Sequence, residues 1–169
     1  ACVGRLKVDV KGQSLLLQVL SKRKWKDRDW ILNIYGSGPD EALLEELITF
    51  YDLKNRVFLK GFVDDIRKDI WGENHLLLMP SYFEGLPIAL VEAMLSGRSA
   101  VVTDVGGNSE ILKGAELGVI AEGATPSSFD KAMENSWVKK DEWEAMGIKA
   151  HKQACEYFGN DPVSRLLED

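Results

Sequence analysis

The stretch LLLMPSYFEGLPIALVEAMLSG, residues 76–97, indicates a strand, a loop and a helix in that order. Its first four residues form a continuous apolar run that Pro80 ends, which is too short for a helix and typical of a strand buried on both faces. Residues 87–96 carry apolar side chains at helical spacing, with Pro87 near the first turn, where the missing N–H costs nothing. Gly97 ends this helix. Such a strand–loop–helix unit is the building block of an α/β fold.

The same alternation of strands and helices extends over the rest of the chain. Further strands are predicted at residues 2–6, 30–35, 56–60, 100–103 and 118–121. Helices are predicted at about residues 13–25, 43–51, 64–71, 127–137 and 141–157. Repeated strand–helix units give a parallel sheet with helices on both faces. We therefore expect one doubly wound, Rossmann-like α/β domain of about six strands over residues 1–169, with no linker or internal repeat.

The composition is that of a soluble globular protein, with 45% hydrophobic and 28% charged residues. A net charge of −6 argues against a nucleic-acid partner, and no apolar run is long enough for a membrane-spanning helix. The basic run at residues 22–26 is interpreted as a solvated helix end. Cys2 and Cys155 lie far apart, and His75 and His151 form no metal-binding pattern. We expect a cytoplasmic protein without a metal site.

In a doubly wound sheet, ligands bind outside the carboxyl ends of the strands, so the residues that follow each strand are the candidates for function. Arg5 and Lys11 follow the first strand close to a helix start, which favours an anion site, although both could be solvated surface cations. Gly36-Ser37-Gly38-Pro39 follows the second strand, either as a tight turn or as a ligand contact. It does not continue as GxGxxG, which disfavours a nicotinamide dinucleotide.

Two glutamates follow the strand at residues 76–79. Glu84 lies in the loop, and Glu92 interrupts an apolar helix, so its carboxylate must face a cleft or be paired. The free amides of Ile88 and Ala89 at the helix start could hold a phosphate. A purely structural alternative makes Glu84 a helix-start acid and Glu92 the partner of a lysine.

The ordered set of these motifs resembles the carboxyl-terminal, donor-binding domain of a group 1 glycosyltransferase (glycosyltransferase family 4, retaining, GT-B fold). The matching segments are residues 3–6 with 11–12, 35–39, 56–57 to 61–63, 80–81 with 84–94, 97, and 103–107 with 110. Glu84 and Glu92, separated by seven residues, match the signature pair of the family. Each segment is weak evidence alone, and the order of the whole set makes the resemblance specific.

The resemblance implies a role for each candidate residue. Arg5 and Lys11 match the cations that neutralise the diphosphate of the donor as it departs, and Glu84 matches the glutamate that contacts the donor sugar. These three residues form the predicted catalytic set. Glu92 matches the glutamate that binds the ribose hydroxyls. The remaining donor-binding positions are the two turn glycines, the nucleobase loop and the pyrophosphate loop, namely Gly36, Gly38, Phe62, Val63, Gly85, Leu86, Pro87, Ile88 and Ala89.

The resemblance also implies a substrate and a parent enzyme. The substrate is a nucleoside-diphosphate sugar, without a cofactor or metal, and the parent transfers the glycosyl group to an acceptor hydroxyl with retention, in polysaccharide or glycolipid synthesis. The opening ACVGRL is interpreted as a chain that starts inside a strand, in a processed protein or an excised domain. The amino-terminal acceptor domain of the GT-B fold is then absent, and peripheral membrane association would come only through that half. Alone, this chain would bind donor without completing catalysis.

Two alternatives stay open: a stand-alone nucleotide-binding or regulatory module, and half of a GT-B sugar-nucleotide epimerase. The chain departs from the family pattern at Asn74-His75, Ser99 and Asn108-Ser109, which we interpret as capping and turn variants. If Trp143, Tyr157 and Phe158 once packed against the absent half, we expect them to be exposed and to allow dimerisation.

Overall fold

The computed structural model describes residues 1–114 and 116–158 and has alternating strands and helices. The strands are β1 (Cys2–Val3), β2 (Leu32–Tyr35), β3 (Val57–Gly61), β4 (Leu76–Met79), β5 (Ser99–Thr103) and β6 (Gly118–Ala121). The α-helices are α1 (Val8–Lys11), α2 (Gln13–Leu20), α3 (Arg23–Lys26), α4 (Glu41–Phe50), α5 (Ile88–Leu95), α6 (Asn108–Ile111), α7 (Pro126–Trp137) and α8 (Trp143–Phe158). The other elements of the described residues are a π-helix, η1 (Ile66–Trp71), and a 3-10 turn, η2 (Lys140–Glu142).

All six strands run parallel, in two three-stranded ladders ordered β1-β2-β3 and β4-β5-β6. Ala1 joins the two ladders: its amino group donates to the Leu76 carbonyl at 2.6 Å, and the Leu78 N–H donates to the Ala1 carbonyl at 2.7 Å. The spatial order is therefore β3-β2-β1-β4-β5-β6, with its reversal between β1 and β4. This order is that of a doubly wound fold. The α/β class is confirmed, while the expected single sheet is two ladders, because β1 itself pairs only with β2.

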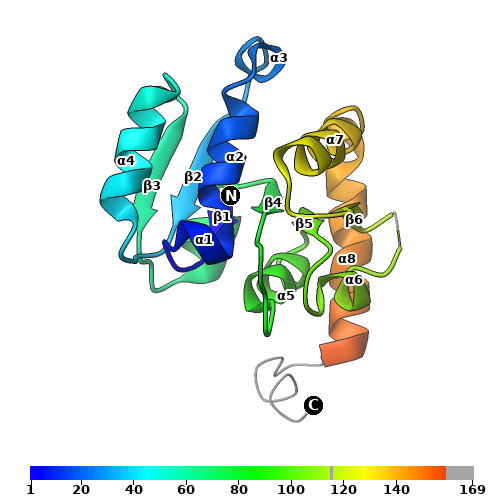
Figure 1. Ribbon diagram of the computed structural model, residues 1–169. Helices are drawn as coiled ribbons and strands as arrows, with labels where there is room; N and C mark the ends of the chain where they lie inside the picture. Colours follow the sequence, from blue (N-terminus) through cyan, green and yellow to red (C-terminus); the bar gives the residue numbers. More distant parts are fainter. Residues whose placement is uncertain (115, 159–169) are drawn as a thin grey trace.

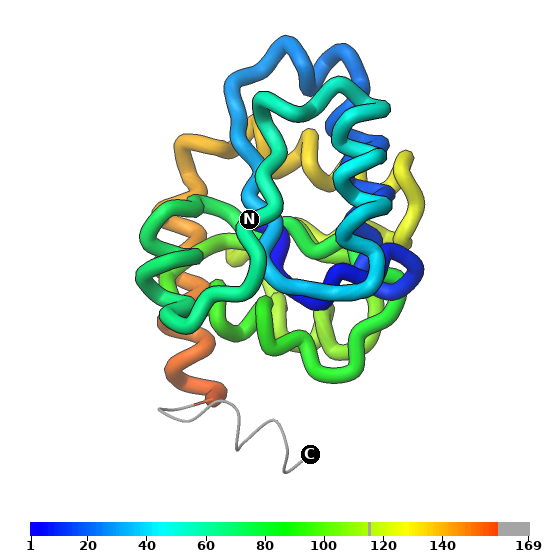
Figure 2. Tube along the Cα trace, turned by 90° about the vertical axis from the view of Figure 1, so that its left-hand side faces the viewer, coloured from blue at the N-terminus to red at the C-terminus, as the bar shows by residue number. Residues whose placement is uncertain are grey.

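Successive residues of each strand face opposite sides of the sheet, and this alternation builds two cores. Cys2, Ile34 and Val101 belong to a core covered by α2, α4 and α7. Ala1 and Val102 belong to the second core, which η1, α5 and α8 cover. Figure 1 shows β1 to β3 on one side of the molecule and β4 to β6 on the other, with helices before and behind. In Figure 2 the amino terminus lies in the middle of the molecule.

The helix predicted over residues 13–25 is two helices in the structure. Gly12, at φ +67, leads into α2, and Lys22 then adopts an extended conformation (φ −63, ψ 143) that separates α2 from α3. The interpretation of residues 22–26 as a solvated helix end is wrong in part, because Trp25 is 1% exposed and Lys22 bonds to Asp130 at 2.8 Å. Thr125 caps α7 by accepting from the Ser128 N–H at 3.2 Å, with Pro126 in the first turn.

None of the helices in residues 1–114 and 116–158 combines the length and the hydropathy that a membrane span requires.

Candidate active site

Lys11 and Glu84, two of the three predicted catalytic residues, meet at the carboxyl edge of the sheet. The ammonium of Lys11 donates to both Glu84 carboxylate oxygens, Oε1 and Oε2, at 2.8 Å each. The Glu84 side chain is 4% exposed and the Lys11 side chain 26%. Charge-assisted bonds in a sheltered place are stronger than neutral ones, and removal of either partner leaves a buried charge uncompensated. The pair joins the loop after β4 to the end of α1.

Ser81 fixes the Glu84 carboxylate from the other side, a contact that the sequence analysis missed. Its hydroxyl donates to Glu84 Oε1 at 2.6 Å. Ser81 is supported in turn, because the Thr103 hydroxyl donates to the Ser81 carbonyl at 2.6 Å and Asn108 Nδ2 donates to the Thr103 carbonyl at 2.9 Å. Ser81 lies two positions after Met79, the last residue of β4, and three before Glu84, which is the signal that could have identified it.

Arg5 lies exposed on the loop that follows β1. Its carbonyl accepts a bond of 2.9 Å from the amide of Gln13, a fully buried side chain at the start of α2. The Leu6 N–H, next in the chain, donates to the Ser37 carbonyl at 3.0 Å. The loop is therefore anchored through its backbone while the guanidinium stays accessible. Gln13 is a second residue that the sequence analysis missed; its position at the first turn of α2 was the available signal.

The turn glycines after β2 allow two loops to approach each other. A Cβ on Gly36, at φ +126, would lie 2.1 Å from the Gly4 carbonyl oxygen, and one on Gly38 would lie 2.3 Å from the Leu6 carbonyl oxygen. Both distances are far below van der Waals contact, so only glycine fits at either position. The Gly36 N–H also donates to the Gly61 carbonyl at 2.8 Å, which ties the loop after β3 to the same edge. The close approach of the two loops is one reason for glycine at both positions, and their predicted contact with a donor stays a prediction.

The end of the loop between β4 and α5 is exposed at Gly85 and Leu86 and buried at Pro87, and Ile88, which begins α5, is exposed. The Ile88 N–H donates to the Leu86 carbonyl at 2.9 Å. The prediction of a free Ile88 amide is therefore wrong, because the turn at Pro87 brings this amide onto the loop itself. Ala89 follows as the second residue of α5.

Glu92 lies on α5 among the buried residues Leu90, Val91, Ala93 and Met94, and is itself half-buried. It is one turn after Ile88, so the two side chains share a helix face. Burial raises the pKa of Glu92 above its ordinary 4.5. Within the described residues no lysine pairs with this carboxylate. The arrangement leaves its oxygens available to hydroxyl donors from outside the protein.

Phe62 and Val63 follow β3 at the same edge. Phe62 is 77% exposed, and Val63 packs against the core beneath α5 and α8. An exposed aromatic ring next to an anchored loop can stack on a flat ligand.

In the part of the chain that the structure describes, no group of three or more His, Cys, Asp or Glu side chains is placed to hold a metal ion.

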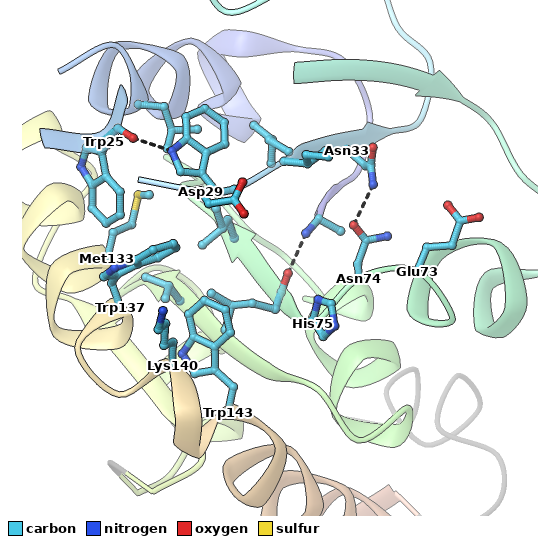
Figure 3. Close-up of a pocket in the computed structure, with 18 residues that line it drawn as sticks. Trp25, Asp29, Asn33, Glu73, Asn74, His75, Met133, Trp137, Lys140 and Trp143 are labelled. Atoms are coloured by element: carbon cyan, nitrogen blue, oxygen red, sulfur yellow. Dashed lines mark hydrogen bonds between the residues drawn. The ribbon is translucent and has the colours of Figure 1, made fainter. Parts of the chain in front are cut away.

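A pocket of about 530 Å³ lies away from this site, at the amino ends of β2 and β4 (Figure 3). None of the predicted site residues lines it.

Two residues that depart from the family pattern, Asn74 and Ser99, make buried hydrogen bonds and are not the capping or turn residues that we expected. Asn74 is buried and donates to the Tyr35 hydroxyl at 3.0 Å and the Ile70 carbonyl at 2.7 Å. Ser99 lies inside β5, with its hydroxyl bonded to the Leu117 carbonyl at 2.8 Å. The expectation that Phe158 is exposed is wrong, since it is 4% exposed in the second core, while Tyr157 beside it is 59% exposed.

Comparisons with known proteins show to which family the chain belongs. Residues 1–137 match the family described as glycosyl transferases group 1. Alpha-D-kanosaminyltransferase of Streptomyces kanamyceticus is 29% identical over 119 residues, which cover 70% of this chain and 31% of that protein. An uncharacterised glycosyltransferase of Methanocaldococcus jannaschii, MJ1607, is 32% identical over 128 residues, covering 75% of this chain and 32% of that protein.

Among solved structures, Anabaena HepE in complex with UDP-glucose is similar, with a TM-score of 0.79 at 22% identity, covering 99% of this chain and 47% of that one. The chain spans about a third of the length of the two curated relatives. The match over residues 1–137, together with the parallel sheet and its loops, shows that the chain belongs to the group 1 glycosyl transferases.

Proposed function

We propose that this chain is the donor-binding part of a longer, retaining GT-B glycosyltransferase that uses a nucleoside-diphosphate sugar. The observation that carries the proposal is the Lys11–Glu84 pair beside the exposed Arg5, at the strand-order reversal between β1 and β4. Ligands of doubly wound sheets bind at such a reversal. The relatives are about three times as long as this chain, which supports a second, acceptor-binding domain in the parent.

The residues of the site can perform the chemistry of such a reaction. Cleavage of the bond between sugar and diphosphate leaves negative charge on the departing phosphate, and fixed cations stabilise that charge. Arg5 and Lys11 supply the cations at this edge. Carboxylate oxygens accept hydrogen bonds from hydroxyl groups, so Glu84 suits the sugar and Glu92 the ribose. Because the cations provide the charge that a metal ion otherwise would, we propose that the reaction needs no metal or other cofactor.

Binding of donor changes the Lys11–Glu84 pair in this proposal. Lys11 uses its ammonium on both Glu84 oxygens, and a phosphate that contacts Lys11 competes for it. Glu84 keeps the bond from Ser81 and turns its second oxygen to the sugar.

Both cysteines of the described chain are free, which supports the further proposal of a cytoplasmic location.

Calorimetric titration of this chain with UDP, GDP and ADP tests the proposal, with UDP first because HepE holds UDP-glucose. We expect one nucleotide to bind selectively. Arg5→Ala and Glu92→Gln should each weaken its binding by about 10- to 100-fold, as loss of one charged hydrogen bond predicts. Lys131→Ala is the control, because Lys131 is exposed on α7 and pairs only loosely with Glu122, at 3.8 Å.

Equal affinity in wild type, Arg5→Ala and Glu92→Gln, or no binding at millimolar nucleotide, would contradict the assignment of the donor site. In the longer protein, transfer from the matching nucleotide sugar with retained configuration separates the glycosyltransferase from a binding module and from an epimerase.

A further inference from the structure

A cysteine and a histidine meet on the surface of α8. Cys155 follows His151 by four positions, and both residues are exposed. Residues four apart share one face of a helix, so their side chains can approach each other. The Cys155 Sγ lies 3.5 Å from Nε2 of the imidazole ring and 3.9 Å from Nδ1. The thiol is therefore placed to donate its proton to Nε2.

The neighbouring helix α5 fixes the orientation of this histidine. Nδ1 of His151 lies 2.7 Å from the carbonyl oxygen of Leu95, the last residue of α5. A carbonyl oxygen only accepts hydrogen bonds, so Nδ1 carries the proton of the neutral ring and Nε2 presents a lone pair. Carbonyls in the last turn of a helix have no partner within the helix, so Leu95 has an acceptor free for this bond. The bond turns the basic nitrogen of His151 toward Cys155.

The thiol, the imidazole and the carbonyl form a chain of three groups in which each orients the next. A nucleophile beside a base, with the base held by a third group, is the arrangement that activates cysteine for attack. The thiolate is the reacting form of cysteine, and a base that accepts the proton as the new bond forms speeds the reaction. A capping role for His151 at the end of α5 uses Nδ1 alone and does not require Nε2 to face a thiol.

The second cysteine of the chain has the opposite surroundings. Cys2 is 4% exposed and belongs to the core that α2, α4 and α7 cover. Burial raises the pKa of its thiol to about 11, so this thiol stays protonated as well as inaccessible. The molecule therefore contains an internal reference, because one thiol is sheltered in the core and the other lies on the surface beside a base.

We propose that Cys155 is a site of reversible modification by low-molecular-weight disulfides, with His151 as the base. In this step Nε2 accepts the thiol proton while the Cys155 sulfur attacks one sulfur of the disulfide. A mixed disulfide forms, the S–S bond of the reagent breaks, and the departing thiolate takes the proton from His151. The Cys155 sulfur is oxidised and the leaving sulfur is reduced, so no further oxidant is needed. Attack by another thiol reverses the modification.

This site is separate from the candidate active site. Helix α5 begins next to the loop after β4, at the carboxyl edge of the sheet, and ends before β5 begins at the opposite edge. Leu95 and the histidine that contacts it therefore lie at the far end of α5, where α8 packs against it (Figure 1). The inference does not depend on the proposed function, and nucleotide binding can fail without affecting it.

The test follows the reaction of the chain with glutathione disulfide, using mass spectrometry of the digested protein to measure the adduct at each cysteine over time. His151→Gln is the diagnostic variant, because its amide can still donate to the Leu95 carbonyl but offers no basic nitrogen to the thiol. Lys152→Gln is the matched control, since Lys152 is exposed beside His151 on the same helix and its replacement keeps the base. The urea-unfolded chain gives the rate of the same thiol without the helix.

We expect Cys155 to react at least about tenfold faster in the folded chain than in the unfolded one, as assistance by a positioned base predicts. His151→Gln should remove this advantage and Lys152→Gln should keep it, while Cys2 should react only after unfolding. Equal rates of Cys155 in the folded and unfolded wild type, or an unchanged rate in folded His151→Gln, would overturn the proposal. The first comparison uses the wild-type chain alone, so it decides the matter even if the variant fails to fold.

Discussion

Gly106 shows how strongly single residues constrain the candidate site. It adopts φ +54 in the loop after β5, and a Cβ there would lie 2.1 Å from the carbonyl oxygen of Glu84. The loop that carries Glu84 can keep its place only while this position has no side chain. The same holds for Gly12, whose Cβ would lie 2.1 Å from the Pro80 carbonyl oxygen. Backbone contacts thus set the position of the loop on both sides of Glu84.

We predict that Gly106→Ala lowers the free energy of unfolding by about 1–3 kcal/mol, because the methyl group clashes and the left-handed backbone strains a residue with a Cβ. Nucleotide affinity should fall with it, since the clash displaces Glu84. Urea unfolding and calorimetric titration measure the two effects. Gly123→Ala is the matched control, because a Cβ there meets nothing within 4 Å. Equal stability of the two variants would show that the loop adjusts freely.

Sequence reasoning identified the charged residues of the site but not how they contact one another. Arg5, Lys11 and Glu84 were predictable because the carboxyl ends of parallel strands meet at one edge. The bond between Lys11 and Glu84 spans 73 positions, and no local pattern encodes such a pair. Ser81 and Gln13 lie close in sequence to their partners, Glu84 and Arg5, but the sequence pattern does not state that their side chains turn toward these residues. The roles of all these residues in donor binding stay predictions.

At the scale of elements, α3 is attached to α7 by a cluster of charges around a buried indole. Trp25 Nε1 donates to Asp130 at 2.7 Å, and Lys22 and Lys24 each approach the same carboxylate at 2.8 Å. Burial would raise the pKa of Asp130, but the hydrogen bonds from Lys22, Lys24 and Trp25 outweigh it, and the pKa lies below the usual 3.8. The cluster explains why Trp25 packs against α7 while Lys22 and Lys24, although exposed, are held in ion pairs.

We predict that Asp130→Ala lowers the free energy of unfolding at pH 7 by about 1–3 kcal/mol, because it leaves the Trp25 N–H without its acceptor and removes two ion pairs. Since the pKa of Asp130 is lowered by folding, its contribution is complete above pH 3.8 and is lost as pH falls through the folded value. Urea unfolding at pH 7 and at pH 2.5 measures both. Glu122→Ala, in an exposed pair with Lys131, should change stability by less than about 0.5 kcal/mol.

Element types could be predicted better than element boundaries. The strands predicted at residues 76–79 and 118–121 agree with β4 and β6. A run of four apolar residues between turn residues is too short for a helix, so its boundaries as a strand are well defined. The long helix predicted from residue 13 breaks at Lys22, where the packing of Trp25 against α7 overrides local propensity. The π-helical form of η1 had no signal in the sequence pattern.

At the scale of the whole molecule, a chain prepared to begin at Ala1 has a buried amino group that makes its free energy of unfolding depend on pH. Its pKa is 8.0 when free and about 5 in the fold, so the unfolded chain binds more protons between these values. We therefore predict that stability rises with pH from about 5 to 8 and is complete above 8, with a total effect of at most about 4 kcal/mol. Thermal unfolding across this range measures it.

The control is the same chain acetylated at Ala1, which has no amino group to titrate and keeps the histidines. Its Tm should vary much less between pH 5 and 8 than that of the free chain. Parallel pH profiles for the two forms would contradict the prediction.

The fold class followed from the strand–helix alternation, and the structure confirms it as α/β with helices on both faces. The division of the sheet into two ladders could not be predicted, because periodicity does not state which strand neighbours which. That information lies in the contacts of Ala1 with Leu76 and Leu78, far apart in the chain.

This junction has a consequence for the order in which the molecule folds. Within each ladder, neighbouring strands are joined by one local crossover, so each can form after closing a short loop of chain. The junction between the ladders closes a loop of 75 positions, which carries a larger entropic cost than either ladder. Contacts of high sequence separation slow folding, so we expect the pairing of β1 with β4 to form later than the pairing within each ladder.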